Sequence, residues 1–198
     1  MKKVKQNFTQ LIFILVSIII IQSCSSSKEA ISETPKNRGE VEIVEYCSGD
    51  EYFSNKNFFR ANATGESLDR ETAKKKARAN AMAQLAKSIN ATMKIVGDNY
   101  VNSTEFNNKE EVTETFNELS RTVVDQELSG AVKICDKLTQ KADDNKYVSY
   151  IALELSGQSI ASKYAESLSK NEKIKADYNY EKFKETFEKE MEKLGNRN

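Results

Sequence analysis

The sequence predicts an α+β fold, in which an antiparallel sheet of three to four strands is covered by one long alanine-rich helix and by further helices. Residues 58–64 are rich in aromatic and small residues, as expected of a strand, and an alanine-rich helical pattern follows them. Residues 131–137 and 147–155 alternate between apolar and polar side chains on either side of a polar turn, residues 141–146. These alternating segments predict an antiparallel hairpin with one buried face.

The long helix is expected to begin after Gly65, which breaks the preceding strand. Ser67 is the predicted N-cap, and Asp69 and Glu71 fall in the first turn, where carboxylates complement the helix dipole. Small side chains on the apolar face would let the helix lie close to the sheet, so this face predicts packing rather than a binding site. Its members recur every four residues: Ala73, Ala77, Ala81, Leu85 and Ile89.

Further elements follow from the same periodicities. Partial alternation predicts a short strand at residues 41–46, and residues 92–96 predict another, which continues to Val101 after a break at Gly97. Residues 110–127 carry apolar side chains at three- and four-residue steps and predict an amphipathic helix.

Two more helices are predicted towards the C-terminus. After Gly157, Ile160, Tyr164 and Leu168 lie at helical spacing. Residues 171–198 predict a C-terminal amphipathic helix in which a narrow apolar seam is surrounded by Lys and Glu. Such a seam suits docking along the domain or pairing with the same helix of another copy, which would give a homo-oligomer. The seam consists of Tyr180, Phe183, Phe187, Met191 and Leu194.

The N-terminal segment has the pattern of an export signal. Lys2, Lys3 and Lys5 precede residues 11–21, in which Ser17 is the only polar residue. A membrane-spanning helix needs roughly 20 apolar residues, so this run is too short to span and fits the core of a signal peptide.

Residues 21–24, Ile-Gln-Ser-Cys, resemble the lipobox of bacterial lipoprotein precursors. The resemblance implies a signal peptide at residues 1–23, with a diacylglyceryl group on the thiol of Cys24 and a further acyl chain on its amine. Two or three chains would hold the protein on a membrane, and Ser25 resembles the sorting residue of outer-membrane cargo. Residues 24–40 would then be a flexible tether and residues 41–170 the main domain. An ordinary secreted protein cleaved near Ser23 is the alternative.

Composition excludes several classes of site. There is no histidine, which removes histidine-dependent catalysis and zinc sites that rely on imidazole. The seven glycines are scattered and form no phosphate-binding loop. Without residues 1–23 the chain has 27 basic and 30 acidic residues, a charge of −3, so nucleic acid is not an expected partner. No cofactor is expected. The adjacent acids at residues 110–111 and 143–144 are expected to be solvated.

Cys47 and Cys135 are the thiols that remain if Cys24 is lipidated. An exported protein meets an oxidising compartment, so the two cysteines can form a disulfide. Two buried free thiols are the alternative, because sequence alone does not show the required geometry.

The strand, Gly65 and the alanine-rich helix, with residues 128–132 and 147–155, resemble the core pattern of the LPP-twenty family, the twenty-kilodalton bacterial lipoproteins. The N-terminal domain of the flagellar assembly protein T is similar. The resemblance covers residues 58–168 and implies an exported, membrane-tethered α+β domain with no established enzymatic activity.

The expected function is therefore that of a bacterial outer-membrane lipoprotein, anchored through Cys24, whose domain is a non-catalytic binding or assembly module in the envelope. A protein partner in the envelope is an expected ligand. Two other functions stay open: a carboxylate-based hydrolase of envelope polysaccharide, and a structural lipoprotein that self-assembles through its C-terminal helix. A hydrolase would need two acids from separate segments that meet in a cleft.

Overall fold

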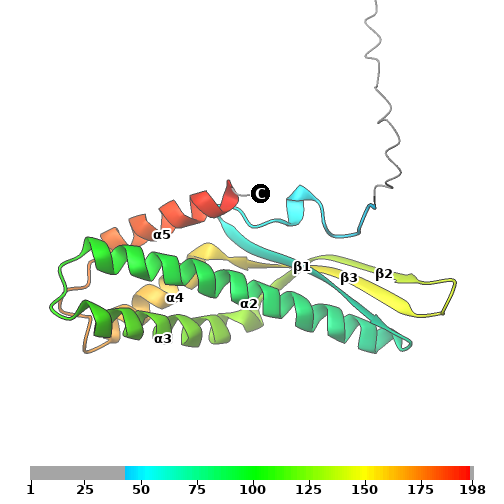
Figure 1. Ribbon diagram of the computed structural model, residues 1–198, viewed down its shortest axis with the longest axis horizontal. Coiled ribbons are helices and arrows are strands. Elements are labelled where there is room, and N and C mark those ends of the chain that lie inside the picture. Colours follow the sequence, from blue (N-terminus) through cyan, green and yellow to red (C-terminus); the bar gives the residue numbers. More distant parts are fainter. Residues whose placement is uncertain (1–42, 197–198) are drawn as a thin grey trace, which may run out of the picture. The chain divides into compact units, whose positions relative to one another are not determined.

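The computed structural model describes residues 43–196. Its sheet has three antiparallel strands, β1 (Phe58–Ser67), β2 (Val132–Gln140) and β3 (Tyr147–Ser156), in the order β1-β3-β2 (Figure 1). The hairpin of β2 and β3 is closed by Lys141, whose N–H donates to the carbonyl of Lys146 over 2.9 Å. The predicted α+β class, the antiparallel sheet and the hairpin are therefore confirmed.

The long helix α2 (Arg70–Ser103) has 34 residues and is therefore about 51 Å long. Its N-terminal half covers one face of the sheet, along β1 and β3 (Figure 1). Ala73, Ala77 and Ala81 are fully buried there. The contact is closest at Gly65, where an added Cβ would lie 2.3 Å from the backbone nitrogen of Ala77 and 2.4 Å from the carbonyl oxygen of Ala73. Helix and strand can approach this closely only because position 65 has no side chain.

The start of α2 differs from the prediction in two respects. Gly65 does not break the strand, because β1 continues through it to Ser67. The N-cap is Asp69 rather than Ser67, and the Asp69 carboxylate accepts a hydrogen bond from the N–H of Thr72 over 2.7 Å. The carboxylate is the stronger acceptor for a helix N-terminus, and its bond to Thr72 helps to hold the pKa of Asp69 below its usual value.

The predicted strand at residues 92–96, with its continuation to Val101, is wrong, because these residues belong to α2. Thr92, Val96 and Val101 have β-branched side chains, which favour strands when local propensity decides. Here their spacing continues the buried face of the helix, and Val96 and Val101 are almost completely buried. Burial of this face outweighs the small loss of helix propensity. Gly97 lies within the helix, where an added Cβ would lie 3.3 Å from the ring of Phe116.

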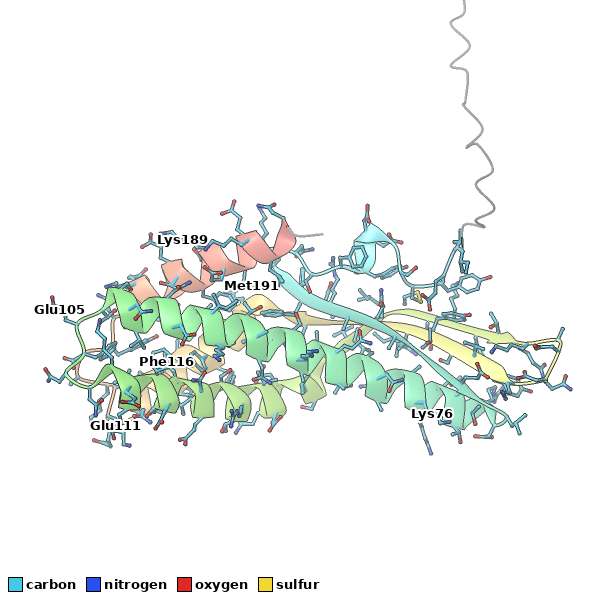
Figure 2. The ribbon with its side chains drawn as sticks, in the orientation of Figure 1. Lys76, Glu105, Glu111, Phe116, Lys189 and Met191 are labelled. Atoms are coloured by element: carbon cyan, nitrogen blue, oxygen red, sulfur yellow. A yellow bond between two sulfur atoms is a disulfide. The ribbon has the colours of Figure 1, made fainter. Side chains whose placement is uncertain are left out.

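Three more helices pack with the C-terminal half of α2 or with one another: α3 (Lys109–Glu127), α4 (Gly157–Lys170) and α5 (Tyr180–Gly195). Figure 2 shows Phe116 of α3 on the side of that helix that faces α2. The ring of Tyr100 lies 5.5 Å from that of Phe116 and 5.9 Å from that of Phe183, so one buried tyrosine of α2 contacts both α3 and α5. The hydroxyl of Tyr164 on α4 donates to the carbonyl of Phe116 over 2.6 Å.

Helix α5 is docked on the domain through its N-cap residue and through its apolar seam. The Tyr100 hydroxyl accepts a hydrogen bond over 2.7 Å from the N–H of Asn179, the N-cap residue of α5. Phe183, Phe187 and Met191 are at most 5% exposed, so three of the five apolar seam residues are covered by the same chain. Of the two arrangements that the sequence allows for the seam, the structure therefore shows docking along the domain.

The outer edge of β1 is covered by side chains. The N–H of Arg60 donates to the hydroxyl of Ser54 over 2.9 Å, and Asn80 of α2 donates its amide to the carbonyl of Thr64 over 2.9 Å. At the end of the strand, the carboxylate of Glu66 pairs with Lys141 and Lys146 of the hairpin loop, which hold the pKa of Glu66 below its usual value. These contacts satisfy edge groups that would otherwise be open to another strand.

Two other predictions need correction. Residues 43–46 form no strand, and residues 41 and 42 lie outside the described part of the chain. The expected buried face of β2 is also wrong, because β2 lies at the sheet edge and Val132 is 60% exposed. A register shift between Lys133 and Cys135 interrupts the alternation there, so the buried positions belong mainly to β3.

We expect Gly65→Ala to destabilise the fold by about 3 kcal/mol, because the added methyl group would overlap the backbone of α2. Urea unfolding followed by circular dichroism would measure this change. Gly130→Ala is the matched control, because an added Cβ there meets only a methyl group of Leu155 at 4.0 Å. Equal stability of the two variants would show that α2 does not depend on close approach to β1.

Candidate functional site

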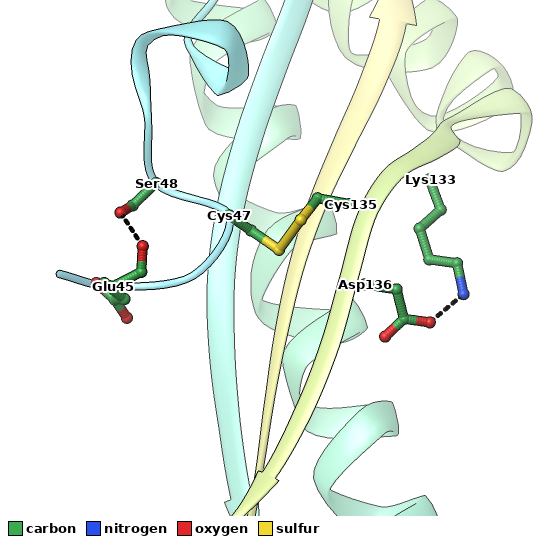
Figure 3. The surroundings of a disulfide bond; sticks show 6 residues. All are labelled: Glu45, Cys47, Ser48, Lys133, Cys135 and Asp136. Carbon is green, nitrogen blue, oxygen red and sulfur yellow. Dashed lines mark hydrogen bonds and ion pairs between the residues drawn. A yellow bond between two sulfur atoms is a disulfide. The ribbon is translucent and has the colours of Figure 1, made fainter.

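The residues predicted to be functional lie in two places. Cys24, the predicted lipid attachment residue, lies outside the described residues. Cys47 and Cys135 are joined by a disulfide, with their Cα atoms 5.7 Å apart and a separation of 88 positions in sequence (Figure 3). The bond connects the segment that precedes β1 to the edge strand β2.

The disulfide holds the first described residues against the sheet. Cys135 pairs with Ala152 of β3, on the face opposite Leu153 and therefore opposite α2. Beside it, the ring of Tyr46 lies 5.3 Å from that of Tyr150 in an edge-on arrangement. Cys47 has a φ of 59°, which is uncommon for a residue with a side chain, and the cross-link helps to hold this backbone in place. The segment that precedes β1 is thus fixed covalently to the sheet at Cys47.

A groove of about 760 Å³ lies between α4, α5 and the start of β1. Phe183 and Phe187 lie beneath it and are 1% and 5% exposed, so its apolar surface comes mainly from Phe58, which is half-buried. Tyr180, 48% exposed, stands at its edge. A volume of several hundred Å³ with aromatic walls is typical of ligand-binding clefts.

Polar and charged residues form the rim of the groove. They come from three segments that are far apart in sequence and carry both signs of charge. Lys184 and Glu188, one turn apart on α5, lie 4.0 Å from each other and are exposed. The rim residues are Lys56, Asn57, Ser156, Gln158, Ser162, Lys184, Glu188 and Glu192.

Two glycines let these segments meet beside the groove. The N–H of Gly157, at the start of α4, donates to the carbonyl of Asn57 over 2.9 Å, and an added Cβ would lie 3.1 Å from that oxygen. At the end of α5, an added Cβ on Gly195 would lie 3.1 Å from the backbone nitrogen of Lys56. The chain before β1 therefore packs against the ends of both helices, and it contributes Lys56 and Asn57 to the rim.

The acids in and near the groove are arranged for solvation and ion pairing. Glu188 and Glu192 lie one turn apart on the same exposed face of α5, whereas a hydrolase of the expected kind would use acids from separate segments. Of the adjacent pairs in the sequence, Glu111 pairs with Lys173 over 2.6 Å, which lowers the pKa of the glutamate. Asp144 pairs with Lys146 over 2.8 Å in the hairpin loop. Within residues 43–196, no group of three or more Cys, Asp or Glu side chains could hold a metal ion.

The arrangement is suited to binding. The rings of Phe58 and Tyr180 can contact an apolar group of a ligand, and a rim of both charge signs fixes the orientation of polar groups. Sequence reasoning identified the aromatic residues Tyr180, Phe183 and Phe187 as a seam but did not identify the groove. Lys56 and Gln158 have no signal in the sequence, because their role depends on contacts between segments about 100 residues apart.

We expect removal of the disulfide to lower the free energy of unfolding by roughly 4 kcal/mol, because an 88-residue loop is then no longer closed in the unfolded chain. The double variant Cys47→Ser/Cys135→Ser would be compared with the parent chain by thermal and urea unfolding. Reductant should destabilise the parent to the same extent and leave the double variant unchanged. Free thiols at both positions in the non-reduced parent chain, found by mass analysis, would contradict the cross-link.

Comparisons with known proteins leave the family open. No protein-family model matches the chain, and a search of the curated proteins finds no match. Within residues 43–196, none of the helices combines the length and the apolar character that crossing a membrane requires.

Proposed function

We propose that this protein is a lipoprotein of the bacterial outer membrane, anchored through Cys24, whose α+β domain binds a protein partner of the envelope in the groove between α4 and α5. The observation that carries the proposal is the groove itself, with its buried aromatic floor and its rim of mixed charge. In this proposal the domain is a binding module and the lipid anchor keeps it at the membrane surface.

The anchor rests on the sequence of residues 1–24 and is supported by the cross-link in the domain. The basic start, the short apolar run and the cysteine stand in the order of a lipoprotein signal. A disulfide between Cys47 and Cys135 fits an oxidising compartment such as the periplasm. Both observations support export, and Ser25 supports the outer membrane as the destination.

A polypeptide segment is the partner that suits the groove best. Lys56 and Lys184 stand near Glu188 and Glu192 on the rim, so a partner of one charge sign would meet repulsion as well as attraction. A peptide that carries an apolar side chain between charged residues would place that side chain against the half-buried Phe58 and the exposed ring of Tyr180. The half-buried Ala161 also lines the groove, and its small side chain leaves space for the apolar side chain of the peptide.

Self-assembly through the C-terminal helix is less well supported, because the apolar seam is occupied. Phe183, Phe187 and Met191 are buried against the domain, and a helix of a second copy would reach them only after α5 undocks. Undocking would also break the hydrogen bonds between Tyr100 and Asn179.

The anchor is tested by metabolic labelling with palmitate. We expect the parent protein to be labelled and to sediment with the outer membrane, and Cys24→Ser to lose the label and leave that fraction. Cys47→Ser is the matched control, because it removes a different cysteine and should keep the label. A Cys24→Ser protein that stays labelled would refute the anchor.

The groove is tested by photo-crosslinking in intact cells. A photoreactive residue at Gln158 or Ser162, both exposed on the rim, should capture a second protein. The same residue at Gln84, which is exposed on α2, is the control and should not capture it. Ala161→Trp, which fills the groove, should reduce capture several-fold without loss of the folded domain. Equal capture from Gln84, or capture of only a second copy of this chain, would contradict the proposal.

A further inference from the structure

A second hollow, of about 390 Å³, lies between α2 and α3, apart from the groove between α4 and α5. The two helices run side by side there (Figure 1). Each helix contributes three residues, and none of the six is acidic. They are Asn90, Ala91 and Lys94 from α2, and Asn117, Ser120 and Arg121 from α3.

The lining repeats one pattern on both helices. Asn90 and Lys94 are four residues apart on α2, and Asn117 and Arg121 are four residues apart on α3, so each helix presents an amide and a cation on one face. Ser120 and Ala91 are small, which leaves space between the four longer side chains. The hollow is therefore bounded by two amides and two cations.

Both cations lack a carboxylate partner in the described part of the chain. Within residues 43–196, neither Lys94 nor Arg121 forms an ion pair, although Asp98 and Asp125 each lie one helical turn away from one of them. Elsewhere on α3, Glu111 does pair with Lys173 over 2.6 Å. Neither cation is therefore held in an ion pair by the described residues, and each is free to pair with an anion in the hollow.

The amide of Asn90 is oriented as a donor. Ser120, only 4% exposed, donates its hydroxyl to Oδ1 of Asn90 over 3.4 Å, which leaves the Nδ2 group of Asn90 free to donate. Asn117 adds a second amide. Donors from Asn90, Lys94, Asn117 and Arg121 therefore surround one space.

We propose that this hollow binds a phosphate group. Two cations and two amides offer more donors than the two oxygens of a carboxylate accept, whereas a phosphate presents up to four oxygens and carries more charge. Arginine recognises phosphate through paired N–H groups, and lysine adds a point charge. The phosphate belongs either to a free phosphomonoester or to the head group of a phospholipid, and both present the same chemistry to these side chains.

The test is a titration of the full chain, purified in a non-ionic detergent, with inorganic phosphate at constant ionic strength, followed by NMR of the backbone amides. We expect saturable shifts centred on Asn90, Asn117 and Arg121, and none with chloride. Lys94→Gln/Arg121→Gln should weaken binding by about tenfold or more, since two charged donors are lost. Arg78→Gln/Lys87→Gln removes the same charge from exposed positions of α2 outside the hollow and should bind as the parent does.

A parallel titration with glycerophosphoglycerol, the water-soluble head group of phosphatidylglycerol, identifies the source of the phosphate. Tighter binding of inorganic phosphate assigns the site to a phosphomonoester, and tighter binding of the diester assigns it to a lipid head group. Unfolding midpoints of both double variants establish that each is folded. The proposal is overturned if neither probe gives saturable shifts at these residues, or if the two double variants bind equally well.

Discussion

The close contact between the alanine face of α2 and β1 at Gly65 is the constraint on which the rest of the structure depends. An added Cβ at Gly65 would lie within 2.4 Å of two backbone atoms of α2, so the helix is held at a distance that no side chain at this position permits. This contact sets how α2 crosses the sheet. Because α2 is a single helix of 34 residues, it also sets where its C-terminal half can receive α3 and α5.

The C-terminal half of α2 uses a different kind of contact. Alanine packs against the sheet, whereas Tyr100 packs in a cluster of rings and binds the N-cap residue of α5 through its hydroxyl. A buried phenol needs a hydrogen-bond partner, and burial raises its pKa, so Tyr100 stays neutral in this setting. The position of α5 therefore depends on α2, and the groove beside α4 depends on both helices.

The cross-link and the two hollows occupy different parts of the fold. Cys47 is joined to β2 on the sheet face opposite α2, whereas the groove lies between α4, α5 and β1, and the second hollow lies between α2 and α3. The cross-link is therefore separate from both hollows.

Local sequence pattern was enough to predict the alanine face, the helix at residues 110–127, the hairpin and its turn, and the cysteine pair as one of two alternatives. It misassigned residues 92–101, because β-branched side chains favour strands locally and only burial against α3 and α5 makes them helical. It also missed the groove and the hollow between α2 and α3. Lys56 and Glu192 line one groove, and Ser120 donates to Asn90, only after distant segments pack together, so no spacing along the chain contains that information. Only the tertiary structure forms these two sites, because the packing of whole helices brings together side chains that are far apart in sequence.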